Sequence, residues 1–246
     1  RRITSVTSCS GQRAVPVNSM CSKKWLMPLL ASVSCREPTG MIIFSATVPC
    51  WAFNSSPETI AEVVSHEFGH TLGLQHHGTT SGATYYGGHG SGAVSWAPIM
   101  GVAYYMSLSQ WSRGEYANAN NRGQDDIAII AEMSTNGLGF VADEAGNTRV
   151  VAATLNAPSG TIAQPGLITS GTDVDFFVFT VTGPSNFSLT GAPATVAPNL
   201  DLGLELQDAT GAVLVSSNPD LQLTASLART LGAGTYYIKA LGVGRG

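Results

Sequence analysis

The pattern of apolar and polar residues divides the chain into parts that predict different structures. Residues 1 to about 40 show neither the period of two of a strand nor the 3.6-residue period of a helix, so no element is predicted there. Residues 41–44 and 47–53 are rich in β-branched and aromatic side chains, which favours two strands. Beyond about residue 166, short apolar runs between turn residues predict a separate β-rich part.

One helix is predicted with a definite start and end. Ser56 precedes Pro57 and Glu58, which together give a capping hydroxyl, a proline in the first turn and an acidic side chain near the helix N-terminus. Apolar residues then recur at every fourth position, which predicts one buried stripe: Ile60, Val64, Phe68 and Leu72. Gly73 follows, and glycine readily takes the left-handed conformation that ends a helix.

A long connection follows this helix. Residues 77–96 are rich in glycine, serine and threonine, and long loops of this kind are often functional. Residues 97–101 predict a tight turn, and residues 124–132 predict a second helix. Residues 143–165 have the glycine, proline and asparagine content of a linker.

The part after this linker has the signature of an all-β sandwich or jelly roll, because short strands alternate with Gly, Pro, Asn and Asp turns. The predicted strands are residues 174–181, 187–189, 200–206, 212–215, 221–227 and 235–241.

Composition and charge narrow the function. The chain has 246 residues, 43% of them hydrophobic and 11% charged, which is typical of folded proteins and not of disordered ones. Its net charge of −4 gives no electrostatic footprint for nucleic acid, although six of the 12 basic residues precede residue 40. No apolar run reaches the roughly 20 residues of a membrane-spanning helix. We therefore expect neither a nucleic-acid partner nor a transmembrane segment.

Two features near the start indicate export. Residues 23–35 have the basic, apolar and small-residue order of a signal peptide, with a short buried strand or helix as the alternative. The chain has four cysteines and no Cys-x-x-Cys pair, which favours two disulfides over a cysteine zinc site. Three pairings are open for Cys9, Cys21, Cys35 and Cys50. The expected location is secreted, with attachment to the cell surface as a variant.

The strongest chemical signal is a histidine cluster on the first predicted helix. His66 and His70 are one turn apart and face the same way, so two imidazoles can hold one metal ion. Gly73 allows a sharp turn that brings His76 to the same ion. Glu67 lies beside the metal as a general base. Three imidazoles with one open position are typical of a catalytic zinc site.

This extended motif resembles that of the metzincin zinc endopeptidases, in particular the bacterial reprolysin-like enzymes, over residues 40–135. In that family a methionine turn forms a hydrophobic floor under the metal, which implies this role for Met100 within residues 98–101. Some members have a tyrosine ligand two residues after the methionine, but position 102 is Val. Tyr104 and Tyr105 then become candidates to contact the substrate oxyanion. His77, the next histidine, is expected to face solvent.

The length before the motif departs from the family. Only 65 residues precede His66, fewer than a metzincin sheet occupies, and position 1 is Arg. We therefore interpret residues 1–142 as an α+β metzincin-like domain, incomplete at its N-terminus, in which residues 1–38 have no assigned structure.

Residues 166–246 resemble the bacterial pre-peptidase C-terminal domain, without its last strands. The matching segments are residues 171–179, 199–202 and 233–238. Within the first segment, Asp173 and Asp175 are candidate ligands for a calcium ion, and a turn that needs acidic side chains is the alternative.

The function implied is hydrolysis of internal peptide bonds in protein or peptide substrates by a monomeric zinc enzyme, without a covalent intermediate. Two alternatives remain: a secreted binding or adhesion protein with an inactive protease-like domain, and a zinc hydrolase of non-protein substrates. Glu67 is present, which argues against the inactive form.

Overall fold

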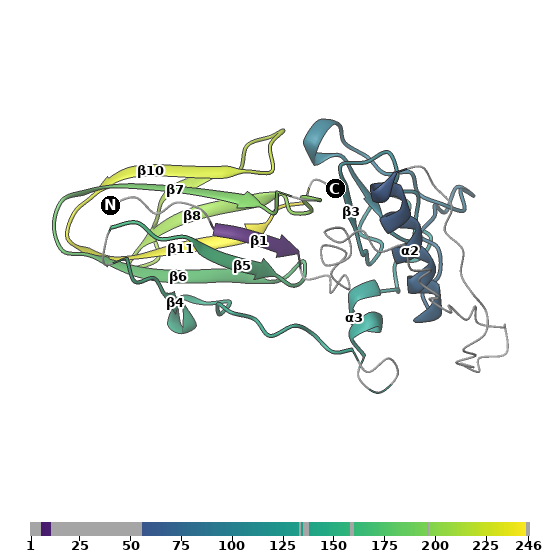
Figure 1. Ribbon diagram of the computed structural model, residues 1–246, viewed down its shortest axis with the longest axis horizontal. Helices are drawn as coiled ribbons and strands as arrows, with labels where there is room; N and C mark the ends of the chain where they lie inside the picture. The colour runs from purple at the N-terminus through teal and green to yellow at the C-terminus, as the bar shows by residue number, and fades with distance from the viewer. Residues whose placement is uncertain are drawn as a thin grey trace, which may run out of the picture. The chain divides into compact units, whose positions relative to one another are not determined.

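The computed structural model describes residues 6–10, 56–132, 134, 138–157, 160–195 and 197–244 (Figure 1). This part of the chain is mostly β, with eleven strands and two α-helices. It forms two compact units, one of residues 6–10, 90–94 and 140–244, the other of residues 56–89 and 95–139. No helix among the described residues is long and apolar enough to cross a membrane.

Several sequence expectations lie outside the described residues. These are the strands at 41–44 and 47–53, the segment at 23–35, and the cysteines at 21, 35 and 50; the side chain of Cys9 is likewise not described. They stay predictions.

The first helix begins and ends where the sequence predicts. Helix α2 spans Pro57–Thr71, and the Ser56 side chain accepts a hydrogen bond from the Thr59 N–H at 3.2 Å. At the other end Gly73 has φ of 96°, and the Leu74 N–H donates to the Gly69 carbonyl at 3.1 Å. This is the bonding of a glycine-terminated helix, in which the chain reverses and leaves the helix axis.

The predicted buried stripe of α2 is wrong. Ile60, Val64 and Phe68 are 37%, 49% and 39% exposed. The buried residues of α2 are instead His66 and Gly69. The face with polar and small residues lies against the unit because the segment around Met100 packs there. A four-residue spacing of apolar residues alone cannot tell which face that is.

The rest of this unit is irregular chain with short elements. They are the parallel strands β2 (Trp96–Pro98) and β3 (Leu108–Gln110) and helix α3 (Asp126–Ala131). The 3₁₀ helix η1 (Gly92–Val94) is grouped with the other unit. The Gly101 N–H donates to the Pro98 carbonyl at 2.9 Å, which confirms the tight turn. Helix α3 confirms the second predicted helix in a shorter form, and Asp125 caps it through the Ala128 N–H.

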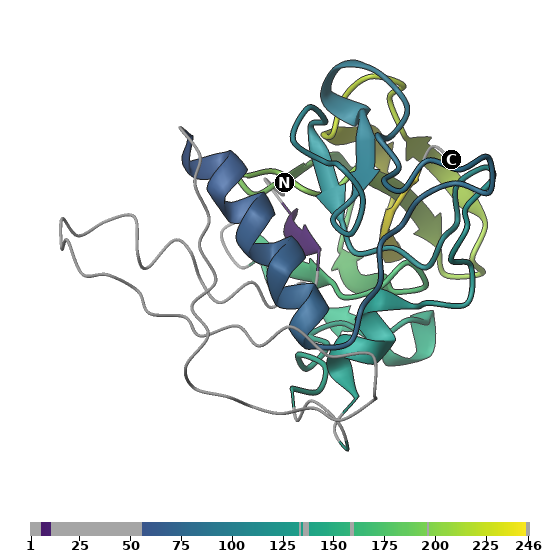
Figure 2. The same cartoon turned by 90° about the vertical axis from the view of Figure 1, so that its right-hand side faces the viewer.

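The other unit consists of two sheets around one apolar core (Figures 1 and 2). One sheet has the order β10-β7-β1-β5 and the other has β4-β6-β11-β8-β9. Phe177, Leu189, Leu204 and Ile238, from both sheets, are at most 1% exposed. The strands are β1 (Val6–Ser10), β4 (Ala153–Thr154), β5 (Gln164–Ile168), β6 (Val174–Val181), β7 (Ser185–Pro193), β8 (Leu202–Asp208), β9 (Val213–Ser217), β10 (Ala225–Leu231) and β11 (Gly234–Gly242).

The segment expected as a linker, residues 143–165, belongs to this unit. It contains the 3₁₀ helix η2 (Arg149–Val151) and β4, which pairs with β6. Ala145 and Leu155 are 3% and 5% exposed in the sandwich core. Small and polar residues gave this segment a linker composition, but two apolar side chains are enough to fix it to the sheet.

Strand β1 is the described part of residues 1–38, where the sequence predicts no element. It pairs in parallel with β5, Val6 opposite Gln164, and with β7, Val6 opposite Gly191. These residues therefore belong to the sandwich sheet and not to the unit that contains α2.

Candidate metal centre

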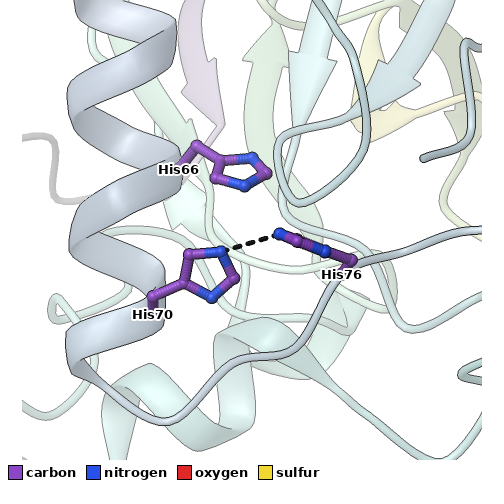
Figure 3. A group of neighbouring side chains, drawn as sticks. All are labelled: His66, His70 and His76. Carbon is purple, nitrogen blue, oxygen red and sulfur yellow. Dashed lines mark hydrogen bonds between the residues drawn. The ribbon is translucent and has the colours of Figure 1, made fainter. Parts of the chain in front are cut away.

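Three predicted ligands come together at the end of α2. His66 and His70 project from the same side of the helix, and His76 approaches from the segment after Gly73 (Figure 3). One ring nitrogen from each lies within 4.8 Å of those of the other two. The Nε2 atoms of His70 and His76 are 2.9 Å apart. The helix spacing and the glycine turn thus produce the convergence that the sequence predicts.

Backbone carbonyls hold two of these rings by their far nitrogens. His66 Nδ1 lies 2.7 Å from the Ile99 carbonyl, and His70 Nδ1 lies 2.8 Å from the Leu74 carbonyl. A carbonyl can only accept, so each Nδ1 carries the proton and each Nε2 keeps its lone pair. Such bonds fix both the tautomer and the orientation of metal-binding histidines.

Burial disfavours the charged form of two of the rings. The pKa of His66 lies below its ordinary value because burial disfavours the charged ring. The pKa of His76 is lowered by burial and by its proximity to His70 and His66. Neutral imidazoles are the form that binds a metal ion, and three of them in this arrangement are the donor set of zinc.

Met100 packs against α2 at Gly69. Its side chain is fully buried, and a methyl group built on Gly69 would meet its sulfur at 2.6 Å. Gly69 lies between the two helical histidines, so the absence of a side chain there lets Met100 approach the helix next to the site. Ile99, the residue before Met100, supplies the carbonyl that holds His66.

His77 does not face solvent. Its side chain is fully buried, with Nε2 3.2 Å from both carboxylate oxygens of Asp126, which is also fully buried. The His77 N–H donates to the Met100 carbonyl at 2.8 Å. The side chain turns inward because this polar pairing compensates its burial. His77 is not part of the histidine group, but its contacts fix the chain next to His76.

The residue on the other side of His76 is anchored as well. Gln124 bonds both backbone groups of Gln75, accepting from its N–H at 2.8 Å and donating to its carbonyl at 2.9 Å. Gln124 also donates to Asp126 at 2.7 Å. Sequence reasoning missed Gln124 and Asp126, because single polar residues before a short helix carry no periodic or motif signal.

Glu67 and Tyr85 lie near the histidine rings, and Tyr104 lies near Glu67. The negative charge of Glu67 acts on His66 and His76, and it contributes, after burial, to the raised pKa of Tyr104. Tyr105 is 85% exposed. Tyr85, which sequence reasoning missed, has its ring centroid 4.4 Å from that of His76. Its place in a glycine-rich loop offers no sequence signal.

A second group of possible ligands lies in the sandwich. Carboxylate oxygens of Asp173 and Asp175, the candidate calcium ligands, lie within 4.8 Å of each other and of one from Asp143. Asp143 was expected in the linker.

Zinc fits the histidine group, because two of its three rings have their tautomers fixed and present lone pairs toward a common point. No protein-family model, curated protein or solved structure matches this chain.

Proposed function

We propose that this chain is a secreted zinc-dependent endopeptidase of metzincin type. The observation that carries the proposal is the convergence of His66, His70 and His76 with Glu67 beside them. Each helical histidine is held by a backbone carbonyl, which is the arrangement of a preorganised metal site and not of incidental surface histidines.

The three Nε2-presenting imidazoles would hold zinc and leave one coordination position open. Zinc in such a site lowers the pKa of a bound water molecule to about 7 and polarises a carbonyl group. The residues around the zinc ion would transfer protons and contact the substrate.

Glu67 would act as the general base and then the general acid. It is a carboxylate next to a ligand in sequence, partly buried and close enough for its charge to act on two of the histidine rings. It would accept a proton from the attacking water and pass it to the leaving amine. No serine or cysteine nucleophile is needed.

Tyrosine hydroxyls would contact the substrate. The charge of Glu67 contributes, after burial, to the raised pKa of Tyr104, and Tyr85 packs against His76. Either O–H can donate to the oxyanion that develops on the scissile carbonyl. Tyr105, at 85% exposed, has a weaker case.

The metzincin assignment is supported by three features that are independent of the histidine spacing. The helix ends at a left-handed Gly73, Met100 packs under Gly69, and Ile99 next to it holds His66. The C-terminal sandwich, as in the pre-peptidase C-terminal domain that it resembles, would act in targeting or substrate contact.

A pair of variants tests the chemistry. Glu67→Gln keeps the side-chain size but cannot take a proton, so zinc should stay near one per chain while hydrolysis of a denatured protein mixture falls about 10²–10⁴-fold. His70→Ala should lose both zinc and activity, because two histidines hold zinc poorly. Metal analysis and a peptidase assay read both out.

The controls separate the rival functions. His89→Ala changes a histidine that contacts Tyr86 outside the triad, and it should keep full zinc and activity. A hydroxamate chelator should block the wild-type reaction. Zinc binding without peptide cleavage would favour the binding protein or a hydrolase of other substrates, and full activity of Glu67→Gln would remove Glu67 from its role.

A further inference from the structure

Asp175 is a buried carboxylate without a compensating partner. It lies in β6, its side chain is fully buried, and neither of its carboxylate oxygens accepts a hydrogen bond from a donor group among the described residues; its one side-chain neighbour at hydrogen-bonding range is another acid, Glu144, which, after burial, raises its pKa. Asp175 also takes part in neither of the two ion pairs found among the described residues, which are His77–Asp126 and Lys239–Glu205. A buried charge of this kind is strongly unfavourable unless a counter-charge joins it.

The acidic neighbours of Asp175 make its ionised form still less favourable. The fully described cluster contains Asp173, 6% exposed, and the exposed Asp143, whose oxygens lie within 4.8 Å of each other and of Asp175. Burial, and after it the charges of Glu144, Asp173 and Asp143, raise the pKa of Asp175 to about 8. The fold thus collects negative charge around a buried acid where a cation would be stabilised.

Hydrogen bonds hold the cluster in place from two segments. In the β5–β6 turn, Asp173 Oδ2 accepts from the Thr169 N–H at 2.6 Å and from its hydroxyl at 2.7 Å. In the segment before β4, Glu144 accepts from the Leu167 N–H at 2.6 Å. The carboxylates are therefore positioned by backbone bonds and do not depend on a metal ion to bring their segments together.

Two further bonds connect these segments. Asn147 Oδ1 accepts from the Val174 N–H at 2.6 Å, and the Phe176 N–H donates to the Gly146 carbonyl at 3.2 Å. Asp143 thus stands on a short stretch of chain that is tied to the first residues of β6, opposite the turn that carries Asp173.

We propose that Asp143, Asp173 and Asp175 bind one calcium ion in the sandwich, with Glu144 beside it. All-oxygen donors are the ligands of calcium, whereas zinc prefers nitrogen and sulfur. Two oxygens bound to one calcium ion at 2.3–2.6 Å are at most about 5 Å apart, which the 4.8 Å limit of this cluster satisfies. Magnesium fits less well because it demands near-ideal octahedral geometry at about 2.1 Å.

The bound ion has a structural role. It neutralises Asp175 and joins residues 143–147 to the β5–β6 turn. Calcium therefore stabilises the sandwich and protects the start of this unit from proteolysis, independently of whether the histidine site binds zinc.

Titration of the full-length chain with calcium tests the proposal. The zinc-loaded, calcium-free protein should bind one calcium ion in calorimetry, with a rise in Tm that magnesium at equal concentration does not reproduce. Asp175→Asn should weaken calcium binding at least tenfold. Its Tm without calcium should equal that of the wild type at pH 7, where a carboxyl with a pKa of about 8 is mostly protonated, and should exceed it above pH 8, where the wild-type carboxylate is charged. Asp143→Asn, at an exposed position, should also weaken binding, with little effect on the calcium-free Tm.

Matched controls locate the site. Asp220→Asn, an exposed acid in the β9–β10 connection, and His70→Ala should both bind calcium like the wild type. If Asp175→Asn does not fold, Asp143→Asn decides. The proposal is wrong if the wild type shows neither heat nor Tm shift up to about 5 mM calcium, above the ~10⁻⁴–10⁻³ M range of extracellular calcium modules. It is also wrong if Asp143→Asn binds normally or His70→Ala abolishes binding.

Discussion

Gly69 is closely surrounded by side chains of other segments. A methyl group there would meet the Met100 sulfur at 2.6 Å, the Trp111 ring at 3.1 Å and Leu74 at 3.2 Å. In an open helix, alanine in place of glycine stabilises by about 0.5–1 kcal/mol. Here the sign should be reversed, because the methyl group must displace the buried side chain of Met100.

Gly69→Ala should therefore destabilise the protein by about 1–3 kcal/mol, the usual cost of overpacking, and lower its zinc affinity. Chemical denaturation and zinc titration measure the two effects. Gly123→Ala is the matched control, since nothing lies within 4 Å of its added methyl group, and it should stay within about 0.5 kcal/mol. A stabilised Gly69→Ala protein would contradict the close approach of Met100.

The three candidate ligands could be predicted from the sequence, whereas the residues that hold them in place could not. His66, His70 and His76 follow from helix spacing and one glycine. His77, adjacent to a ligand, turned out to be buried against Asp126, because its partner lies 49 residues away along the chain. Tyr85 also reaches the site only through the fold.

At the scale of elements, the segment that carries His76 depends on helix α3. Asp126, the first residue of α3, accepts from Ser112 N–H at 3.0 Å and from Gln124 at 2.7 Å, in addition to His77. The start of this short helix thus fixes the residues on both sides of His76, through His77 and through Gln124.

Asp126→Asn should loosen this support. One oxygen of the carboxylate becomes an amide NH2 group, a donor that faces other donors. Stability should therefore fall by about 1–3 kcal/mol. Zinc affinity should fall by up to the about 10–100-fold that outer-shell changes produce. Competition with a chromophoric chelator measures the affinity.

Asp125→Asn is the control for this variant. Asp125 caps α3 through the Ala128 N–H at 3.0 Å, and asparagine caps helices about as well as aspartate. Its stability and zinc affinity should match the wild type. Equal behaviour of the two variants would mean that the buried network does not support the ligand segment.

Element positions followed the sequence best where apolar runs were long. Strand β6 spans the predicted residues 174–181, but β10 lies at Ala225–Leu231 and not at 221–227. Leu221 misled the prediction: it is 64% exposed, and the buried alternation starts at Ala225. On α2 the cap and the end were predictable from local chemistry, while the buried face depends on tertiary packing.

At the scale of the whole molecule, the observed boundary between the two units lies at Phe140, nearer the N-terminus than the predicted linker of residues 143–165. Phe140 and Val141 are 63% and 41% exposed, whereas Ala145 and Leu155 are buried in the sandwich. The composition of residues 143–165 resembles a linker because sequence cannot show which few apolar side chains reach a core.

Chymotrypsin should therefore cut first at Phe140 and not within residues 145–165. The Glu67→Gln variant is the substrate of choice, because it cannot cleave itself under the proposed mechanism. Mass spectrometry of the first products gives the site, and Phe140→Ala should remove that cut. Early cleavage between residues 145 and 165 would show that this segment is not fixed to the sheet.

Strand β1 has a consequence for how the sandwich is assembled. Because β1 lies between β7 and β5, it can pair with β5 only once residues 164–168 have been synthesised, and with β7 only once residues 191–193 have followed. Contacts so distant in sequence are slow to form. A fragment that begins near residue 140 would expose two open backbone edges, on β7 and β5, and such edges recruit other chains. Such a fragment would tend to aggregate, and a synthetic peptide of the Val6–Ser10 sequence would complement it.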